Sequence, residues 1–109
     1  MRQVSFRPLA RNDIRETAIY LAIEASDAVA ERFLDAIQSL VNTLAGASGI
    51  GSSCLFRDPL LKDVRHIPVT GFENWLVFYR TSKDRIDIIR ALHGARNIES
   101  IFGEGEQQL

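Results

Sequence analysis

Few residues of this sequence have side chains that could take part in chemistry. His93 stands beside Gly94, where a strand is expected to end, and it could be a general base, a proton donor or a hydrogen-bonded structural residue. His66 alternates with Val64 in a strand pattern and is interpreted as structural. Cys54, the single cysteine, lies in a loop with no histidine near it in the sequence, so no thiol–imidazole pair is predicted.

Arginines on expected strands are the second group of candidates. Arg65, Arg80 and Arg90 would be costly to bury without a partner. Salt bridges to neighbouring carboxylates would provide that partner, and the candidates are Asp63, Asp84 and Asp87. Alternatively, the guanidinium groups could bind phosphate or carboxylate groups of another molecule.

Motifs for cofactor, metal or nucleophile chemistry are not found. Gly49-Ile50-Gly51 has neither the preceding strand nor the third glycine of a dinucleotide site, and there is no phosphate-loop lysine. No serine stands in a Gly-x-Ser-x-Gly turn, and no histidine pair or carboxylate pair suggests a metal. We therefore expect no cofactor and no bound metal.

Composition predicts one globular domain over residues 1–109, with a frayed tail over 103–109. The 109 residues are 46% hydrophobic and 25% charged, which is ordinary for a single domain. The longest apolar run, Trp75–Tyr79, is far shorter than a membrane span, and no export signal is visible. We expect a cytoplasmic protein that does not associate with membranes.

Charge is unevenly distributed along the chain. The total is −1, which argues against a general nucleic-acid binder. Residues 57–96, however, hold eight basic and five acidic side chains, whereas residues 97–109 hold three acidic side chains and no basic one. The basic middle part suggests a surface suited to an acidic partner.

Hydrophobic spacing predicts a strand, two helices and three further strands. Residues 3–7 alternate like a half-buried strand. Asn12 or Asp13 is expected to cap a first helix, with Glu16 in capping-box spacing, and Ser26-Asp27 precedes a second helix over 28–44. The short break between them predicts an antiparallel helical hairpin. On the first helix Ile19, Tyr20 and Ile23 lie outside the main apolar stripe.

The second half of the chain predicts an antiparallel three-stranded meander over residues 63–68, 75–80 and 85–93, followed by one or two helical turns. The fold class is therefore α+β. With symmetric turns, Arg65 lies opposite Val77 and Val77 opposite Ile89. The face carrying Leu76 and Phe78 is the more continuously aliphatic, so we expect the helices to cover it. The opposite face, with Arg65, Trp75, Tyr79 and His93, is then expected to be exposed, together with Ile67, Val77, Asp87 and Ile89.

Segments 64–68, 75–80 and 86–98 resemble the toxins of ParD/ParE toxin–antitoxin pairs, within the RelE/ParE superfamily. The most specific part is Arg-Ala-Leu-His-Gly-Ala-Arg-Asn-Ile at 90–98, and the length and element order also match. The loop before Arg57 departs from the family, which usually has a proline near a glycine there.

The resemblance implies a plasmid-stabilisation type of toxin that inhibits DNA gyrase and is neutralised by a ParD-like antitoxin in a hetero-oligomer. No direct DNA binding by this chain alone is expected. The residues expected to bind the target or the antitoxin are Arg65, Trp75, Arg90, His93, Arg96, Ile19, Tyr20 and Ile23.

Two alternatives to gyrase inhibition stay open. RelE-like members of the superfamily cleave messenger RNA in the ribosome, and Arg65, Arg80 and His93 could form part of such a catalytic site. Residues 97–109 contain no Tyr, His, Lys or Arg, and their acidic charge would repel RNA, which favours gyrase inhibition by binding. The third possibility is a decayed toxin that only binds its antitoxin.

Overall fold

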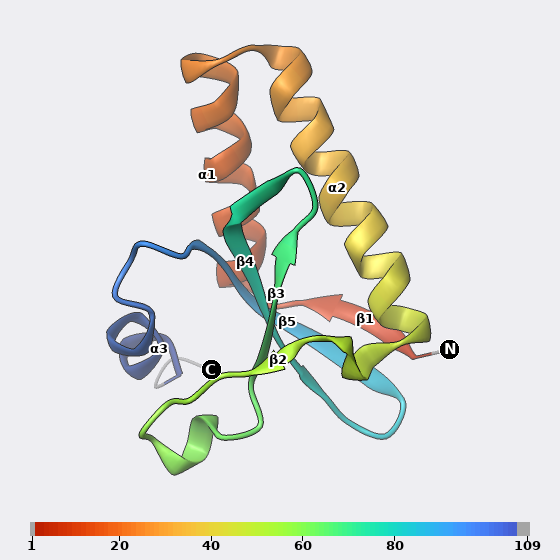
Figure 1. Ribbon diagram of the computed structural model, residues 1–109, viewed down its shortest axis with the longest axis vertical. Coiled ribbons are helices and arrows are strands. Elements are labelled where there is room, and N and C mark those ends of the chain that lie inside the picture. Colours follow the sequence, from red (N-terminus) through yellow and green to blue (C-terminus); the bar gives the residue numbers. More distant parts are fainter. Residues whose placement is uncertain (1, 107–109) are drawn as a thin grey trace.

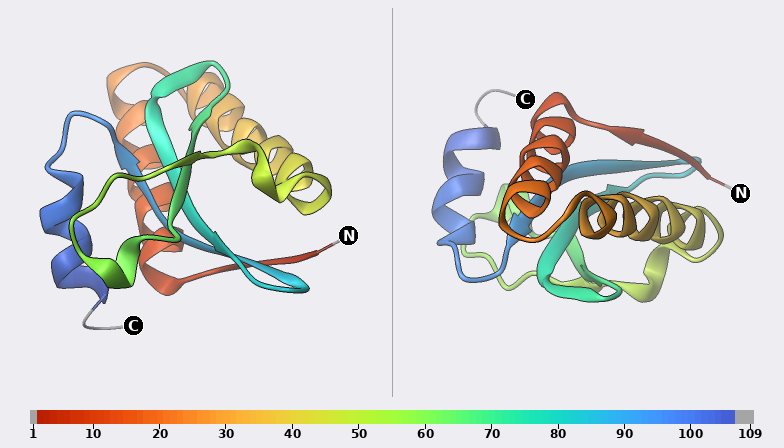
Figure 2. Two further views of the ribbon diagram at one scale, coloured as in Figure 1. Left: turned by 60° about the horizontal axis from the view of Figure 1, so that its bottom comes forward. Right: turned by 90° about the horizontal axis from the view of Figure 1, so that it is seen from above.

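The computed structural model describes residues 2–106, of which 103–106 are described by their backbone alone. A five-stranded sheet carries a helical hairpin on one face and a third helix beside the other, as Figures 1 and 2 show. The elements are β1 (Gln3–Phe6), α1 (Pro8–Glu24), α2 (Asp27–Gly46), β2 (Ser52–Ser53), β3 (Arg65–Val69), β4 (Phe72–Thr81), β5 (Arg85–His93) and α3 (Ile98–Glu106), with short 3-10 helices η1 (Ser48–Ile50) and η2 (Pro59–Leu61). The predicted α+β class is confirmed.

The two long helices form the predicted antiparallel hairpin (Figure 1). Ser26 caps α2, and its Oγ accepts a hydrogen bond of 3.1 Å from the backbone N–H of Val29. The predicted start of α1 at Asn12 or Asp13 is wrong. The helix begins at Pro8, whose ring presets the backbone and whose missing N–H costs nothing at that position.

β1 is parallel to β5, and the other neighbours in the sheet order β1-β5-β4-β3-β2 are antiparallel. The predicted register is wrong, because Arg65 pairs with Tyr79 and Val77 pairs with Ala91. A β-bulge causes a further change, since Phe78 pairs with Arg90 but Tyr79 pairs with Ile88.

The helical hairpin covers the side of β4 that the sequence predicted to be exposed, since Val77 and Tyr79 pack with residues of α1 and α2 in one buried cluster. Ile86 and Ile88 of β5, predicted on the helix-covered face, lie in the same cluster, because the β-bulge brings Ile88 opposite Tyr79. The aliphatic face is covered instead by α3 and the segment before β3, where Phe78 packs with Phe102. Aliphatic continuity could not identify the helix-covered face, because both faces of β4 are buried.

α3 extends to Glu106, so it includes the first four residues of the predicted frayed tail. The remainder of that prediction, residues 107–109, lies outside the described residues. Figure 2 shows α3 lying apart from the α1–α2 hairpin.

Tyr79 fixes the loop between α2 and the sheet. Its fully buried hydroxyl donates to the carbonyl of Ser48 (2.8 Å) and accepts from the N–H of Gly51 (2.9 Å). Burial raises the pKa of Tyr79, partly opposed by the hydrogen bond from Gly51 and the charge of Arg65. Arg65 in turn donates to the carbonyl of Gly51 (2.7 Å), so the loop is fastened at three points.

We predict that Gly51→Ala lowers the free energy of unfolding by about 1–3 kcal/mol, the usual range for overpacking. A Cβ at Gly51 would overlap the Tyr79 hydroxyl and lie 2.9 Å from the His66 carbonyl. Urea unfolding measures the change. Gly49→Ala is the matched control, because a Cβ there meets nothing within 4 Å. Equal stability of the two variants would contradict this role of Gly51.

Candidate binding groove between α1 and the sheet

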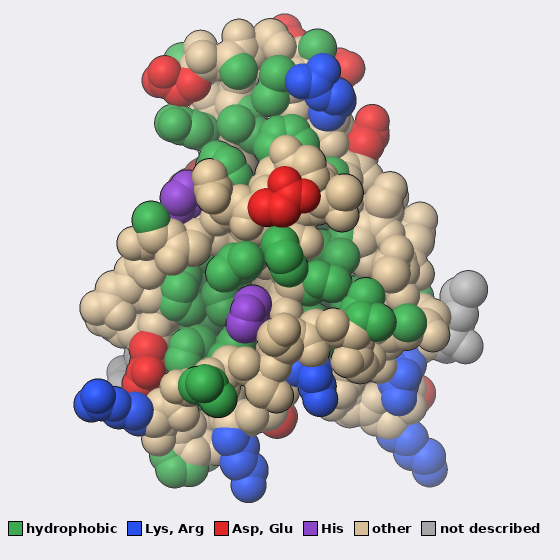
Figure 3. Space-filling view, in the orientation of Figure 1, with side chains coloured by type: hydrophobic (Ala, Val, Ile, Leu, Met, Phe, Trp, Pro, Cys, Tyr) green, Lys and Arg blue, Asp and Glu red, His purple; other side chains and the backbone are tan. Residues whose placement is uncertain are grey.

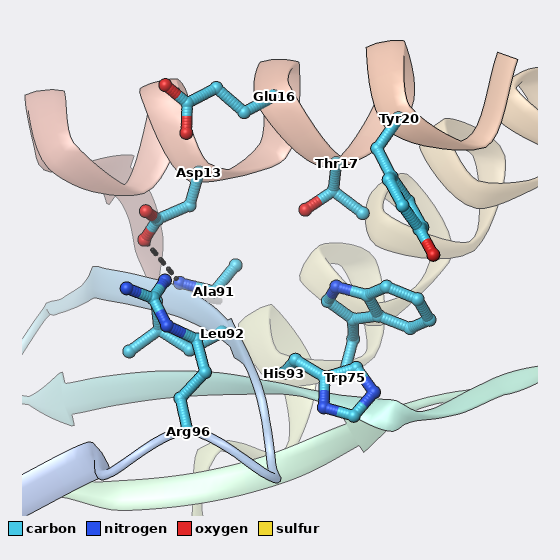
Figure 4. Close-up of a pocket in the computed structure, with 9 residues that line it drawn as sticks. All are labelled: Asp13, Glu16, Thr17, Tyr20, Trp75, Ala91, Leu92, His93 and Arg96. Carbon is cyan, nitrogen blue, oxygen red and sulfur yellow. Dashed lines mark hydrogen bonds between the residues drawn. The ribbon is translucent and has the colours of Figure 1, made fainter. Parts of the chain in front are cut away.

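Asp13 joins α1 to β5 through three hydrogen bonds. Its Oδ2 accepts from Arg90 Nε at 2.8 Å and from the Ala91 N–H at 3.0 Å, and its Oδ1 accepts from Arg90 Nη2 at 2.9 Å. β1 pairs with β5 only as far as Ile88, whereas β5 continues to His93. Asp13 therefore takes the acceptor position that a longer β1 would have filled (Figure 4).

Arg90 is thus a paired, largely buried side chain, with a partner that the sequence did not indicate. None of the three carboxylates proposed from the sequence is the partner of Arg90, but the predicted pairing of a strand arginine with one of them is confirmed for Arg80. Asp63 pairs with Arg80 at 3.0 Å, and Asp87 lies 3.6 Å from Arg7. The sequence analysis did not identify Asp13 as a buried residue, because its type and its spacing to Glu16 suggested a helix cap. Its position among Ala10, Ile14 and Leu21, on the inner side of α1, was the signal that it is buried.

An open groove of about 370 Å³ runs between α1 and the end of β5, next to the Asp13–Arg90 pair. Its lining is Asp13, Glu16, Thr17, Tyr20, Trp75, Ala91, Leu92, His93 and Arg96. Figure 4 shows the rings of Tyr20, Trp75 and His93 gathered at one end. The groove therefore offers an aromatic surface bordered by charged side chains, which is typical of protein-binding hot spots.

The aromatic end of the groove is rigidly supported. Trp75 and His93 are opposite each other on β4 and β5, with ring centroids 4.9 Å apart and nearly perpendicular. Phe33 of α2 lies behind Trp75 at 6.2 Å, and Tyr20 lies at 6.5 Å on the open side. His93 Nδ1 accepts a hydrogen bond of 3.1 Å from the Ala95 N–H, so this nitrogen carries no proton in that arrangement.

The groove continues onto exposed apolar residues of α1. Ile19 and Tyr20 are each about half exposed, and Ile23 is 75% exposed. Ile23 lies four positions after Ile19 and three after Tyr20, so it neighbours both on the surface of the helix. Of the predicted binding residues, the structure brings Tyr20, Trp75, His93 and Arg96 together in the groove, and Ile19 and Ile23 extend it.

Arg65 and Arg80 lie away from this groove. Arg65 pairs with Tyr79, four positions along β4 from Trp75, which corresponds to roughly 13 Å. Arg80 follows Tyr79 and donates to Asp63 and to the carbonyl of Leu60. The three residues proposed for RNA cleavage, Arg65, Arg80 and His93, therefore do not form one site in this conformation.

The structure also brings together two residues that the sequence kept apart. Cys54 Sγ lies 3.3 Å from His66 Nδ1, and the His66 ring packs on Phe78 at 5.9 Å. Burial raises the pKa of the Cys54 thiol to about 11, so the thiol is protonated at neutral pH. This pair therefore lacks the thiolate that nucleophilic chemistry needs.

Among the described residues, no three His, Cys, Asp or Glu side chains are placed to hold a metal ion together. Within the same part of the chain, no helix combines the length and the apolar character needed to cross a membrane.

The fold described above also occurs in a solved structure of another protein. A solved structure, the chromosomal ParDE toxin–antitoxin system from P. aeruginosa, shares this fold with a TM-score of 0.69. The alignment covers 85% of this chain and 96% of that chain, at 16% sequence identity. Residues 4–98 match the family model of the ParE toxin of the type II toxin–antitoxin system parDE, so the chain belongs to the ParE toxin family. No curated protein matches the chain by sequence.

We predict that Asp13→Asn destabilises the fold by about 3–5 kcal/mol, because it leaves the largely buried Arg90 charge without its partner. Urea unfolding measures this change, and Asp35→Asn on the exposed side of α2 is the control, expected within about 0.5 kcal/mol of the parent. In the double variant Asp13→Asn/Arg90→Gln the loss should be smaller than the sum of the two single losses. Strict additivity would show that the pair is not coupled.

We predict that Cys54 reacts slowly with a disulfide reagent at pH 8. A pKa of about 11 in place of 9.0 leaves roughly one hundredth of the thiolate, and burial also restricts access. The reaction can be followed by absorbance, with the urea-unfolded protein as the control. If the folded and the unfolded protein react equally fast, the Cys54 thiol is accessible and its pKa is not raised by the fold.

Proposed function

We propose that this ParE-family chain inhibits DNA gyrase by binding to it and is neutralised by a ParD-like antitoxin. Membership of the ParE toxin family implies a toxin with an antitoxin partner. The observation that carries the proposal is the groove beside the Asp13–Arg90 pair, where rings of Tyr20, Trp75 and His93 adjoin exposed Ile19 and Ile23 on α1. Such a surface suits recognition of another protein.

The arrangement favours binding over RNA cleavage. General acid–base cleavage needs a proton-transfer group and cations around one phosphate. Arg65 is engaged by the Gly51 carbonyl and Arg80 by Asp63, and both lie several strand positions from His93. The antitoxin silences the toxin, in this proposal, by covering the groove that otherwise contacts gyrase.

Purified protein should inhibit supercoiling of relaxed plasmid by gyrase. Trp75→Ala should raise the concentration needed for inhibition roughly tenfold or more, because a partly buried tryptophan that lines a groove is a typical interface hot spot. Ile23→Ser should weaken inhibition in the same direction. Leu34→Ser, a partly exposed leucine on α2 outside the groove, is the matched control and should inhibit like the parent.

Unimpaired supercoiling at all toxin concentrations would exclude gyrase as the target. In that case primer extension on a translated message tests the nuclease alternative, and new cleavages within codons would support it. Loss of those cleavages in His93→Gln would give this residue the proton-transfer role.

A further inference from the structure

The edge of β5 that borders the groove presents backbone groups to it. His93 lies opposite Trp75 in the sheet. The N–H of the next residue, Gly94, donates to the carbonyl of Asn74 at 2.7 Å, so the two opposite residues exchange no hydrogen bond. The backbone groups of His93, and of Ala91 two positions before it, therefore point away from β4 and toward the groove.

Two of the four groups on this edge are satisfied within the chain. The Ala91 N–H donates to Asp13 at 3.0 Å, and the His93 carbonyl accepts from the Arg96 N–H at 3.1 Å. In the part of the chain that the structure describes, no hydrogen bond engages the other two groups, the Ala91 carbonyl and the His93 N–H. β1 does not reach them, because it pairs with β5 only as far as Ile88. The groove therefore offers one backbone acceptor and one backbone donor.

These two groups match one residue of a parallel strand. In a parallel pair, a residue bonds to the carbonyl just before the residue opposite it and to the N–H just after that residue. β1 already follows this pattern on β5, and its Gln3 N–H donates to the Asp84 carbonyl at 3.0 Å. One extended residue opposite Leu92 would continue the line of β1 and bond to both the Ala91 carbonyl and the His93 N–H.

An antiparallel segment matches this edge less well. A residue opposite Ala91 or His93 in that direction exchanges both backbone bonds with it, and one of the two is already taken at each position. The hydrogen bonds within the chain therefore select the direction of an added segment. They also exclude proline at the bonded residue, because proline has no N–H to donate.

The side chains around this edge indicate what accompanies the bonded residue. The bonded residue points, like Leu92, to the face that α3 covers, and the residues on either side of it point to the face of His93 and Trp75. Figure 4 shows these two rings with Tyr20 at that end of the groove, and Figure 3 shows hydrophobic side chains exposed on the hairpin. An apolar side chain directly after the bonded residue would be shielded from water there.

We propose that the groove holds gyrase by strand addition: one extended segment of gyrase runs parallel to β5 and bonds to the Ala91 carbonyl and the His93 N–H. The inference rests on the proposed function, in which the groove is the surface that contacts gyrase. The bonded gyrase residue is not proline, and an apolar residue that follows it packs on Trp75. Backbone hydrogen bonds supply affinity in this mode of recognition, and the aromatic end supplies specificity.

The first test removes the His93 N–H and keeps its side chain. Replacing His93 by its α-hydroxy acid turns this amide into an ester, and the single cysteine, Cys54, allows a synthetic 54–109 segment to be ligated to the preceding residues. The concentration needed to inhibit supercoiling by gyrase should rise about tenfold, as expected for the loss of one hydrogen bond. The matched control is the same ester at Asp84, on the exposed β4–β5 turn, which should inhibit within about twofold of the all-amide chain.

Hydrogen exchange of the unmodified chain gives an independent measurement. In the free protein the His93 N–H should exchange fast, whereas the Ala91 N–H, which is bonded to Asp13, should be protected. Purified gyrase is the probe, and its binding should slow exchange at the His93 N–H about tenfold or more. Exchange at Ala91 serves as the internal reference and should change little.

Photo-crosslinks report the direction of the segment. Asp13 bonds to Ala91 at one end of the groove and Tyr20 lies at the aromatic end, so α1 and the last part of β5 run the same way. Photo-reactive side chains at Glu16 and Ile23 would stand about 10 Å apart along the helix axis. The gyrase residue labelled from Glu16 should precede the one labelled from Ile23, and the reverse order would overturn the parallel arrangement.

Other outcomes also decide the inference. Equal inhibition by the His93 ester and the all-amide chain, or unchanged exchange at the His93 N–H with gyrase bound, would show that gyrase does not bond to this edge. Protection of the same N–H by the purified antitoxin encoded beside this chain, but not by gyrase, would assign the edge to the antitoxin. If the all-amide chain does not inhibit gyrase, the proposed function itself fails. If it inhibits and the ester inhibits equally, only the strand addition fails.

Discussion

The carboxylate of Asp13 is the contact on which the groove depends. β1 ends opposite Ile88 while β5 continues to His93, so the last part of β5 has no strand on that side. Asp13 satisfies the Ala91 N–H there and also pairs with Arg90, which fixes the distance between α1 and β5. An unpaired Arg90 in this largely buried position would be costly, so the two residues constrain each other.

This arrangement explains why a groove exists beside a well-packed core. A longer β1 would have covered the whole edge of β5. The Asp13 side chain instead accepts the hydrogen bond of the Ala91 N–H and leaves open space beside this edge. The rings of Trp75 and His93 line that space from adjacent strands, and Tyr20 reaches it from α1. The groove is therefore built from rigid elements, as the docking role proposed for it requires.

Sequence patterns predicted the elements well and their relative placement less well. Apolar periodicity and the Ser26 cap are local signals, so the helical hairpin was predictable. The face covered by the hairpin was not, because both faces of β4 are apolar and the bulge near Tyr79 shifts β5 by one residue. Asp13 was misinterpreted for a similar reason, since its buried partner is 77 residues away along the chain. The groove residues Trp75, His93 and Arg96 were named from the sequence through the expected sheet face and the family resemblance. Glu16 and Thr17 were not, because their place in the groove depends on how α1 packs against the sheet.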